Sequence, residues 1–328
     1  MTEELMHGIY RITIPLPKNP LRELNCYLIR GAGRNLLIDT GFRQDECREA
    51  LLRELKLLGI SMEETDILLT HLHSDHTGLA PEIASRESRV YIGAADREWL
   101  MKGTRGRLKE KEELRYAEAG LPAELLAFIG KTHPGRAMAP DPEFDKYECL
   151  QDGDVLTVDG DRLEVIETPG HTPSHLCLWM EEQGVMFTGD HILFEITPNI
   201  TSFPDVDDAL GDYLDSLRRI RKYPVRRALP AHRAEGDFHL RIDELLQHHE
   251  SRLNECLQVI CREPGATPFE IAGQMTWRIS AKDWESFPIS QKWFAVGECF
   301  SHLDRLQRLG RVYFQNDSIG VRRYYPTE

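Results

Sequence analysis

The alternation of apolar and polar positions predicts strands in the first part of the chain. Residues 9–14, 26–29 and 36–38 are apolar runs separated by turn signals at residues 15–20 and 31–33. This pattern is typical of an antiparallel meander. Residues 44–58 carry leucines at helical spacing before Gly59, which predicts a helix that ends at this glycine.

Strands and helices alternate in the following segments. We predict strands at residues 67–70 and 89–92, and helices at residues 78–84 and 94–101. Four more strands are expected in the second half, at residues 155–158, 163–167, 176–179 and 185–188. Alternation of this kind indicates an α/β fold.

Residues 102–145 differ from their surroundings. They are charged and partly helical, around residues 110–119 and 122–129, and then become rich in proline and glycine. Two interpretations stay open for this insertion. It forms a lid, or it is a solvated helical excursion without a role in binding substrate, since charged helices are usually exposed.

The C-terminal third has helical periodicity. Residues 242–260 predict one long helix or a helix pair, and Thr267 with Pro268 forms a typical helix start. A helix at residues 298–309 precedes a hairpin pattern at residues 311–325. Three helices followed by a hairpin is the winged-helix layout, so we expect two domains, residues 1–240 and 241–328.

Polar side chains that suit a metal ion follow several of these strands. Since ligands collect where the strands of layered α/β folds end, we expect these positions to converge. Imidazoles mixed with carboxylates favour a hydrolytic metal site, whereas structural zinc sites favour cysteine. The candidates are His71, His73, Asp75 and His76 after residues 67–69, and His171, Asp190 and His232 at later strand ends.

The ordered segments T-H-L-H-S-D-H, T-P-G-H-T-P-S-H, F-T-G-D and P-A-H resemble the metal motifs of metallo-β-lactamase-fold hydrolases. The turn Asp39-Thr40-Gly41 resembles the early Asp-containing turn of the same family. The resemblance runs from residue 8 to residue 232 and is closest to the hydroxyacylglutathione-hydrolase-like branch. It implies a four-layer αβ/βα sandwich with a helical insertion. The C-terminal part resembles the β-lactamase-associated winged-helix domain.

The resemblance also implies how the candidate ligands are shared between two divalent metal ions. It assigns His71, His73 and His171 to one ion, and Asp75, His76 and His232 to the second, with Asp190 bridging both. Zinc is the expected metal, and iron and manganese are the alternatives. A metal-bound hydroxide is then the expected nucleophile, with Asp75 accepting a hydrogen bond from it as the catalytic residue.

Three further residues are expected around the ligands. They are Asp39, His175 and Arg233. We expect His175 to make a structural hydrogen bond, His191 to point away from the site, and Arg233 to pair with a surface acid rather than with an anionic substrate. Ser174 and Arg233 stand where the family usually has glycine. The other histidines are left unassigned: His7, His133, His239, His248 and His302.

The formal charge of −14 disfavours non-specific attraction to nucleic acid or an anionic membrane. The winged-helix region has nearly equal numbers of basic and acidic residues, whereas a DNA-binding domain is normally basic. We therefore expect this region to pack on the catalytic unit or in a homodimer. The basic side chains available to a nucleic acid are Arg305, Arg308, Arg311, Arg322 and Arg323.

The cysteines and the N-terminus favour a cytoplasmic protein without a membrane segment. The seven cysteines are scattered and include no C-x-x-C pair, which is typical of a reducing compartment. The first ten residues lack the basic start and apolar stretch of a signal peptide, and no apolar run is long enough to span a membrane.

These features favour a dinuclear metal-dependent hydrolase that acts on a small thioester or ester. The main alternative is cleavage of RNA phosphodiesters, because relatives with the same winged helix include ribonucleases. A di-iron redox protein is disfavoured, since it would carry Glu at position 73 and a flavin domain. A winged-helix binding module is disfavoured because all seven expected ligands are present. β-Lactam cleavage is disfavoured by the missing signal peptide.

Overall fold

The chain forms two compact units, as seen in a computed structural model that describes residues 1–106, 109–132, 138–278 and 281–327. The first unit contains residues 1–106, 134–198 and 218–242, and the second contains residues 107–133, 199–217 and 243–328. This division differs from the single boundary expected near residue 240. Two earlier segments belong to the same compact unit as the C-terminal part.

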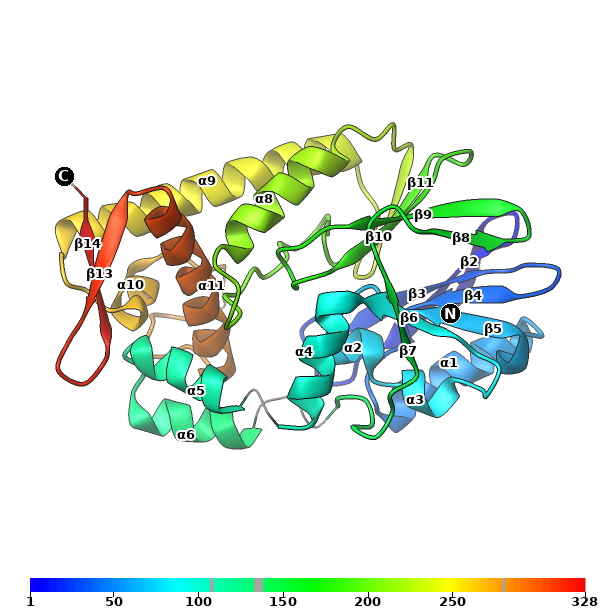
Figure 1. Ribbon diagram of the computed structural model, residues 1–328, viewed down its shortest axis with the longest axis horizontal. Helices are drawn as coiled ribbons and strands as arrows, with labels where there is room; N and C mark the ends of the chain where they lie inside the picture. Colours follow the sequence, from blue (N-terminus) through cyan, green and yellow to red (C-terminus); the bar gives the residue numbers. More distant parts are fainter. Residues whose placement is uncertain (107–108, 133–137, 279–280, 328) are drawn as a thin grey trace. The chain divides into compact units, whose positions relative to one another are not determined.

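A seven-stranded sheet with the order β1-β2-β3-β4-β5-β6-β7 begins the first unit (Figure 1). Strands β1 to β4 pair antiparallel, as the predicted meander requires, and β4 to β7 pair parallel. The first strand, β1, was not predicted. The strands are β1 (Thr2–Met6), β2 (Ile9–Pro15), β3 (Glu23–Ile29), β4 (Asn35–Ile38), β5 (Thr65–Leu68), β6 (Val90–Gly93) and β7 (Tyr147–Leu150).

A second sheet has five strands in the order β12-β11-β10-β9-β8. Its strands are β8 (Val155–Val158), β9 (Asp161–Glu167), β10 (Leu176–Met180), β11 (Val185–Gly189) and β12 (Arg227–Pro230). One buried apolar cluster contains side chains from both sheets, so the sheets pack face to face. Within it the rings of Tyr27 and Phe187 lie 5.3 Å apart, centroid to centroid.

Helices cover the other face of the first sheet (Figure 1). They are α1 (Asp45–Leu57), α2 (Ser74–Thr77), α3 (Ala80–Ile83) and α4 (Ala94–Thr104), with a 3₁₀ turn at Met62–Glu64. Leu51 and Leu55 of α1 pack in one buried cluster with Leu28 and Ile67 of the sheet. The helix predicted at residues 44–58 is therefore confirmed, and Leu51 and Leu55 face the core, whereas Leu52 is exposed.

The outer face of the second sheet is also covered. Trp179 follows Leu178 on β10 and therefore points to the opposite face, where its ring lies 5.7 Å from that of Tyr223. Arg219, near the end of α8 (Ala209–Ile220), forms an ion pair of 2.7 Å with Asp152. The first unit thus has a mixed α/β architecture built around two packed sheets.

The second unit is helical with a terminal β-hairpin. A single helix of 25 residues, α9, settles the choice between one helix and a helix pair. Thr267 caps α10 with a full capping box, as predicted. Besides the first part of α8 and the larger part of α9 (Phe238–Arg262), the elements are α5 (Lys109–Glu118), α6 (Ala123–Thr132), α10 (Pro268–Gln274), α11 (Ile289–Arg308), β13 (Val312–Asn316) and β14 (Arg322–Pro326).

The predicted insertion contributes α5 and α6 to this second unit. Arg115 of α5 forms an ion pair of 2.5 Å with Asp304 of α11, and Glu118 pairs with Arg322 of β14 at 2.7 Å. The N–H of Phe269 donates to the carbonyl of Ala119. Residues 115–119 are therefore packed against the C-terminal helices and hairpin, unlike a solvated excursion.

The described residues contain no helix that is both long enough and apolar enough to cross a bilayer. All seven cysteines are free thiols. Five of them are buried, and Cys149 and Cys261 are exposed. The buried cysteines thus behave as small apolar core residues.

Two histidines are buried against each other in the second unit. His302 donates from Nδ1 to the carbonyl of Glu298 at 2.8 Å, so its Nε2 is free to accept from Nδ1 of His249 at 3.3 Å. Burial lowers the pKa of His302 to about 3 and that of His249 well below its ordinary value. His248, Arg252 and the buried Glu298 carboxyl are the neighbouring charged or titratable groups. The pair is therefore neutral at pH 7.

We expect the buried histidine pair to make the protein less stable in acid. The folded-state pKa of His302 lies below its unfolded value. Its contribution to the free energy of unfolding is therefore complete above about pH 6.5 and is lost as the pH falls toward 3. His302→Asn keeps a donor toward Glu298 and removes the titration. Urea unfolding between pH 7 and 5 is expected to show a shallower decline for the variant, by up to about 1.4 kcal/mol per pH unit. Equal slopes in both proteins would contradict the prediction.

Candidate metal centre

Strand direction brings the first group of predicted ligands to one edge of the seven-stranded sheet. Because β4 and β5 are parallel, Asp39 after β4 and His71 after β5 leave the sheet at the same edge. His73 is the N-cap residue of α2, and this helix of four residues carries Asp75 and His76. A strand end and one short helix therefore position four of the candidate ligands.

The five-stranded sheet positions the other three candidates in the same way. Strands β9 and β11 each pair antiparallel with β10, and β12 pairs parallel with β11, so β9, β11 and β12 share one direction. His171 lies in the loop after β9, Asp190 follows β11, and His232 comes two residues after β12. The loops carrying these residues therefore lie at one edge of this sheet.

Three imidazoles form the first cluster. Nδ1 of His73 lies 2.9 Å from Nε2 of His71 and 3.1 Å from Nε2 of His171. Burial lowers the pKa of His73 to about 3 and that of His71 well below its ordinary value. The rings of His71 and His73 are therefore neutral at pH 7. These three residues form a group whose ligand atoms could hold one metal ion.

The second cluster contains a carboxylate and two imidazoles. Oδ2 of Asp75 lies 3.7 Å from Nε2 of His76 and 3.3 Å from Nε2 of His232. Burial opposes a charge on His76, yet the carboxylates of Asp39, Asp75 and Asp190 raise its pKa to about 10. Burial also opposes the charge of Asp75, but the neighbouring histidines hold its pKa well below the ordinary value. The negative potential at this cluster therefore favours a cation.

Asp190 lies between the two clusters. Its Oδ1 is 3.6 Å from Nε2 of His76 and 3.4 Å from Nε2 of His232, whereas its Oδ2 is 3.7 Å from Nε2 of His171. The two oxygens of one carboxylate therefore face different clusters. This arrangement allows Asp190 to contact two neighbouring cations at once.

Several buried polar atoms of the site, as far as the structure describes the chain, lack a hydrogen-bond partner, and a metal ion could take that partner's place. Nε2 of His76, Nε2 of His232 and Oδ1 of Asp190 are buried and have no hydrogen-bond partner among the described residues. Buried polar atoms without a partner are costly and rare. A divalent cation would satisfy all three. A nitrogen and oxygen donor set suits zinc, iron or manganese.

Hydrogen bonds behind the rings decide which nitrogen faces the site. Nδ1 of His76 donates to Asp39 at 2.7 Å, and Nδ1 of His232 donates to the carbonyl of Glu23 at 2.8 Å. Since Nδ1 makes the outer hydrogen bond in each ring, Nε2 is the nitrogen that faces the cluster and would bind a metal ion. Asp39 also accepts from the backbone N–H of Thr70 at 2.8 Å, which ties it to the chain just before His71.

His175 makes the structural hydrogen bond that the sequence suggested. Its Nε2 accepts from the backbone N–H of Asp190 at 3.1 Å, and its Nδ1 donates to Oγ1 of Thr168 at 2.8 Å. A Cβ on Gly189 would lie 2.5 Å from this Nε2, so the contact needs glycine. His191 is fully buried beside His175, with ring centroids 5.8 Å apart, and belongs to none of the three ligand groups found among the described residues.

Arg233 differs from its expected role. Its guanidinium donates to the backbone carbonyl of Pro20 at 2.7 Å, whereas the ion pair with a surface acid that we expected is not found within the described part of the chain. Its own carbonyl accepts from Asn25 at 3.0 Å, and its φ of 66° lies in the left-handed region. A side chain is uncommon there and glycine is favoured, which agrees with the family preference for glycine at this position. The unassigned His133 lies outside the described residues.

Asp96 is a buried acid next to the site that the sequence analysis did not identify. It lies in the first turn of α4 and accepts hydrogen bonds from the backbone N–H groups of Leu72 and Ser174 and from the hydroxyl of Thr172. Burial raises its pKa to about 6. The signal that could have identified it is its position just beyond β6, at the same sheet edge as Asp39 and His71.

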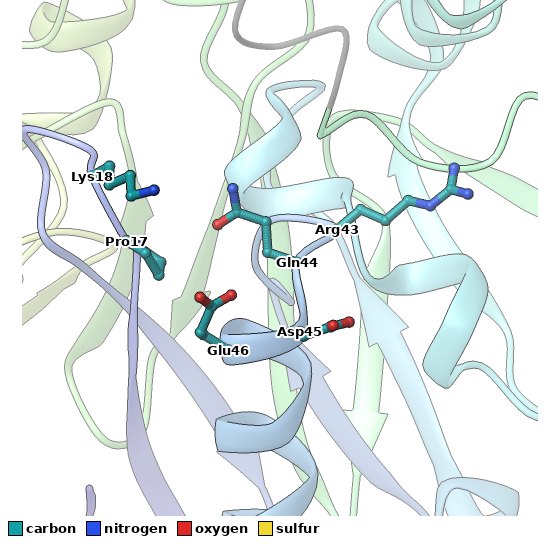
Figure 2. A pocket seen from close by; sticks show the side chains of 6 residues that line it. All are labelled: Pro17, Lys18, Arg43, Gln44, Asp45 and Glu46. Carbon is teal, nitrogen blue, oxygen red and sulfur yellow. The ribbon is translucent and has the colours of Figure 1, made fainter.

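A separate pocket of about 330 Å³ lies at the start of α1. Figure 2 shows Lys18, Gln44 and Glu46 turned toward one another, while Arg43 points away. Arg43 forms an ion pair of 3.3 Å with Glu82. Because both charge signs line this pocket, it shows no preference for a ligand of one charge. The lining residues are Pro17, Lys18, Arg43, Gln44, Asp45 and Glu46.

The chain belongs to the metallo-beta-lactamase superfamily, whose family model matches residues 20–232. The fold and the converging histidines and aspartates agree with this assignment, which places the protein among the metal-dependent hydrolases. The expected α/β sandwich is therefore confirmed as the metallo-β-lactamase fold.

Relatives and solved structures extend the similarity beyond this domain. The lactamase-like protein adaB of Aspergillus niger is 26% identical, over 90% of this chain and 88% of its own length. A metallo-beta-lactamase family protein from Thermus thermophilus is 28% identical, with a TM-score of 0.82 over 99% of this chain and all of its own. A beta-lactamase domain protein from Burkholderia ambifaria is 25% identical, with a TM-score of 0.85 over 99% of this chain and 94% of its own.

One relative carries a more specific name. The atrochrysone carboxyl ACP thioesterase AacuM of Aspergillus aculeatus is 27% identical over 75% of this chain. The chain covers 62% of that relative's length.

Asp39→Asn tests how the second cluster is oriented. Asparagine keeps the shape of the side chain and tolerates the φ of 62° at this position. It is uncharged and has only one acceptor oxygen, so it cannot accept the hydrogen bonds of both Thr70 and His76. We expect the affinity for zinc to fall about 10- to 100-fold. Competition with a chromophoric chelator measures this. An unchanged affinity would show that Asp39 does not orient His76.

Proposed function

We propose that the chain is a dinuclear metal-dependent hydrolase that cleaves a small thioester or ester. The observation that carries this proposal is the position of Asp190, whose Oδ1 faces His76 and His232 while its Oδ2 faces His171. One ion would be held by His71, His73 and His171 and the other by Asp75, His76 and His232. Zinc is the proposed metal, with iron and manganese as alternatives.

The chain's own residues prepare this site for hydrolysis. Two bound divalent ions would activate a water molecule and polarise the carbonyl of the substrate. Asp75 stays ionised at neutral pH because His76 and His232 hold its pKa down, so it accepts a hydrogen bond from the attacking water. The neutral rings of His71 and His73 supply lone pairs without needing to lose a proton.

A thioester or ester is the substrate class that the comparisons favour. The relative AacuM is named as an atrochrysone carboxyl ACP thioesterase. Carrying this substrate class over to the present chain is part of the proposal, since the two proteins are 27% identical.

The C-terminal residues support a role other than binding nucleic acid. The order of α9, α10, α11, β13 and β14 supports a winged-helix assignment for this region. Yet Arg305 pairs with Asp208 at 2.8 Å, Arg322 with Glu118 at 2.7 Å and Arg323 with Asp317 at 3.1 Å. Three of the five arginines considered for nucleic acid are thus neutralised by acids of the same unit. We therefore favour an acyl substrate over RNA.

We also propose that the protein works in the cytoplasm or a similar reducing compartment. Its seven cysteines are free, and two of them, Cys149 and Cys261, are exposed. Exposed free thiols are typical of a reducing environment.

A substrate panel tests the proposed activity. The purified protein, loaded with zinc, iron or manganese in separate samples, is assayed against thioesters, oxygen esters, phosphodiesters and RNA. We expect turnover of thioesters or esters that is lost on chelation and restored by metal. Turnover confined to RNA would replace the proposal with phosphodiester cleavage.

Asp190→Asn tests the bridging carboxylate. The substitution keeps the size of the side chain but replaces one metal-facing oxygen with an amide nitrogen, so only one cluster keeps an acceptor. We expect bound metal to fall from two equivalents to one or none. We also expect kcat/KM to fall more than about 100-fold, which is more than the loss caused by removing a residue that only hydrogen-bonds to a metal ligand. Elemental analysis and kinetics measure both. His7→Ala, an exposed histidine, is the matched control and should change neither.

A further inference from the structure

Asp96 joins two chain segments that carry the ligands of the three-histidine cluster. Its Oδ2 accepts from the backbone N–H of Leu72 at 2.9 Å and from the hydroxyl of Thr172 at 2.6 Å. Its Oδ1 accepts from the backbone N–H of Ser174 at 2.7 Å. The side chain is fully buried. One carboxylate therefore connects a segment near residue 72 with a segment near residue 173.

The donors to Asp96 are sequence neighbours of the proposed metal ligands. Leu72 lies between His71 and His73, and Thr172 directly follows His171. Fixing Leu72 and Thr172 on the same carboxylate oxygen therefore sets the spacing of all three histidines. Asp39 stands behind the other cluster in a similar way, since it accepts from His76.

Ser174 forms further hydrogen bonds between the same two segments. Its Oγ accepts from the backbone N–H of Asp96 at 2.8 Å, so the start of α4 and the loop after His171 hold each other by hydrogen bonds in both directions. A Cβ on Gly93 would lie 2.2 Å from the carbonyl oxygen of Ser174, so this close approach requires glycine. The glycine and the serine together bring α4 against the ligand loop.

The connection requires a carboxylate. Among the described residues, the hydrogen bonds to Asp96 come from backbone N–H groups and hydroxyls, and these use both of its oxygens. An asparagine has one acceptor oxygen and one donor NH₂. In either orientation it would present a donor to a donor, and it would lose the contact to Leu72 or the contact to Ser174.

We propose that Asp96 is a positioning residue for the metal ion held by His71, His73 and His171, with little effect on the ion at the second cluster. This inference rests on the proposed dinuclear site. It assigns separate buried carboxylates to the two halves of the site, Asp96 to the three-histidine cluster and Asp39 to the cluster of Asp75, His76 and His232.

The test measures stepwise metal affinity in metal-free protein and does not depend on activity. Cobalt(II) is the probe, because its visible absorption differs between a three-imidazole and a carboxylate-containing donor set, and zinc affinities follow by competition. For Asp96→Asn we expect the affinity for one of the two metal ions to fall about 10- to 100-fold, with loss of the three-imidazole absorption. The affinity for the other ion should stay unchanged. Asp39→Asn should weaken the other equivalent.

Two further variants keep the test interpretable. Glu98→Gln changes an exposed acid on the same helix, paired with Lys102, and should leave both affinities unchanged. If Asp96→Asn does not fold, Ser174→Ala takes its place. It removes only the hydroxyl contact, so we expect the same equivalent to weaken by about fivefold, the value of one hydrogen bond.

The outcomes separate this inference from the proposed function. Wild-type protein that binds no metal would overturn the proposed function itself. Wild-type protein with two sites, and an Asp96→Asn variant with unchanged affinities, would overturn only the role of Asp96. Equal weakening of both equivalents, together with a lower melting temperature of the metal-free protein, would show a general packing defect and would also overturn it.

Discussion

The position of one buried carboxylate, Asp190, between two sets of imidazoles is the constraint on which the site depends. Its two oxygens face different clusters, and Oδ1 has no hydrogen-bond partner among the described residues. In a buried environment such a group is stable only with a compensating charge or donor. The raised pKa of His76 has the same origin, since three carboxylates surround it. The site therefore favours cations for electrostatic reasons, independently of any sequence motif.

The scaffold around this constraint consists of strand ends and hydrogen bonds behind the ligands. The parallel strands β4, β5 and β6 bring Asp39, the histidine segment and Asp96 to one sheet edge. Asp39 and Asp96 use their carboxylates to hold side chains and backbone, whereas His175 holds the backbone of Asp190. These residues hold the proposed ligands in place from behind, and outer hydrogen-bond partners of this kind tune metal affinity.

The second unit has its own set of buried polar interactions. Arg115 and Arg322 link the predicted insertion to α11 and to the hairpin, and their acidic partners neutralise them. The insertion is thus a structural part of this unit. Basic residues that in the sequence alone offered a surface for nucleic acid are largely used for internal ion pairs.

The amino-acid sequence was enough to predict the seven candidate ligands, the paired sheets and most of the helices. Each ligand follows an apolar run of strand length, and helices such as α1 and α10 carry their periodicity and cap residues within a few positions of each other. The contacts of Asp96 became visible only in the folded chain, because its donors Leu72 and Ser174 lie 24 and 78 residues away. The same is true of Arg115, whose partner Asp304 lies 189 residues away. The tertiary structure likewise showed that Arg233 donates to a carbonyl 213 residues away. The spacing of residues within a helix or strand can be read from the sequence, because it involves near neighbours. The partner of a buried charge depends on which distant segments pack around it.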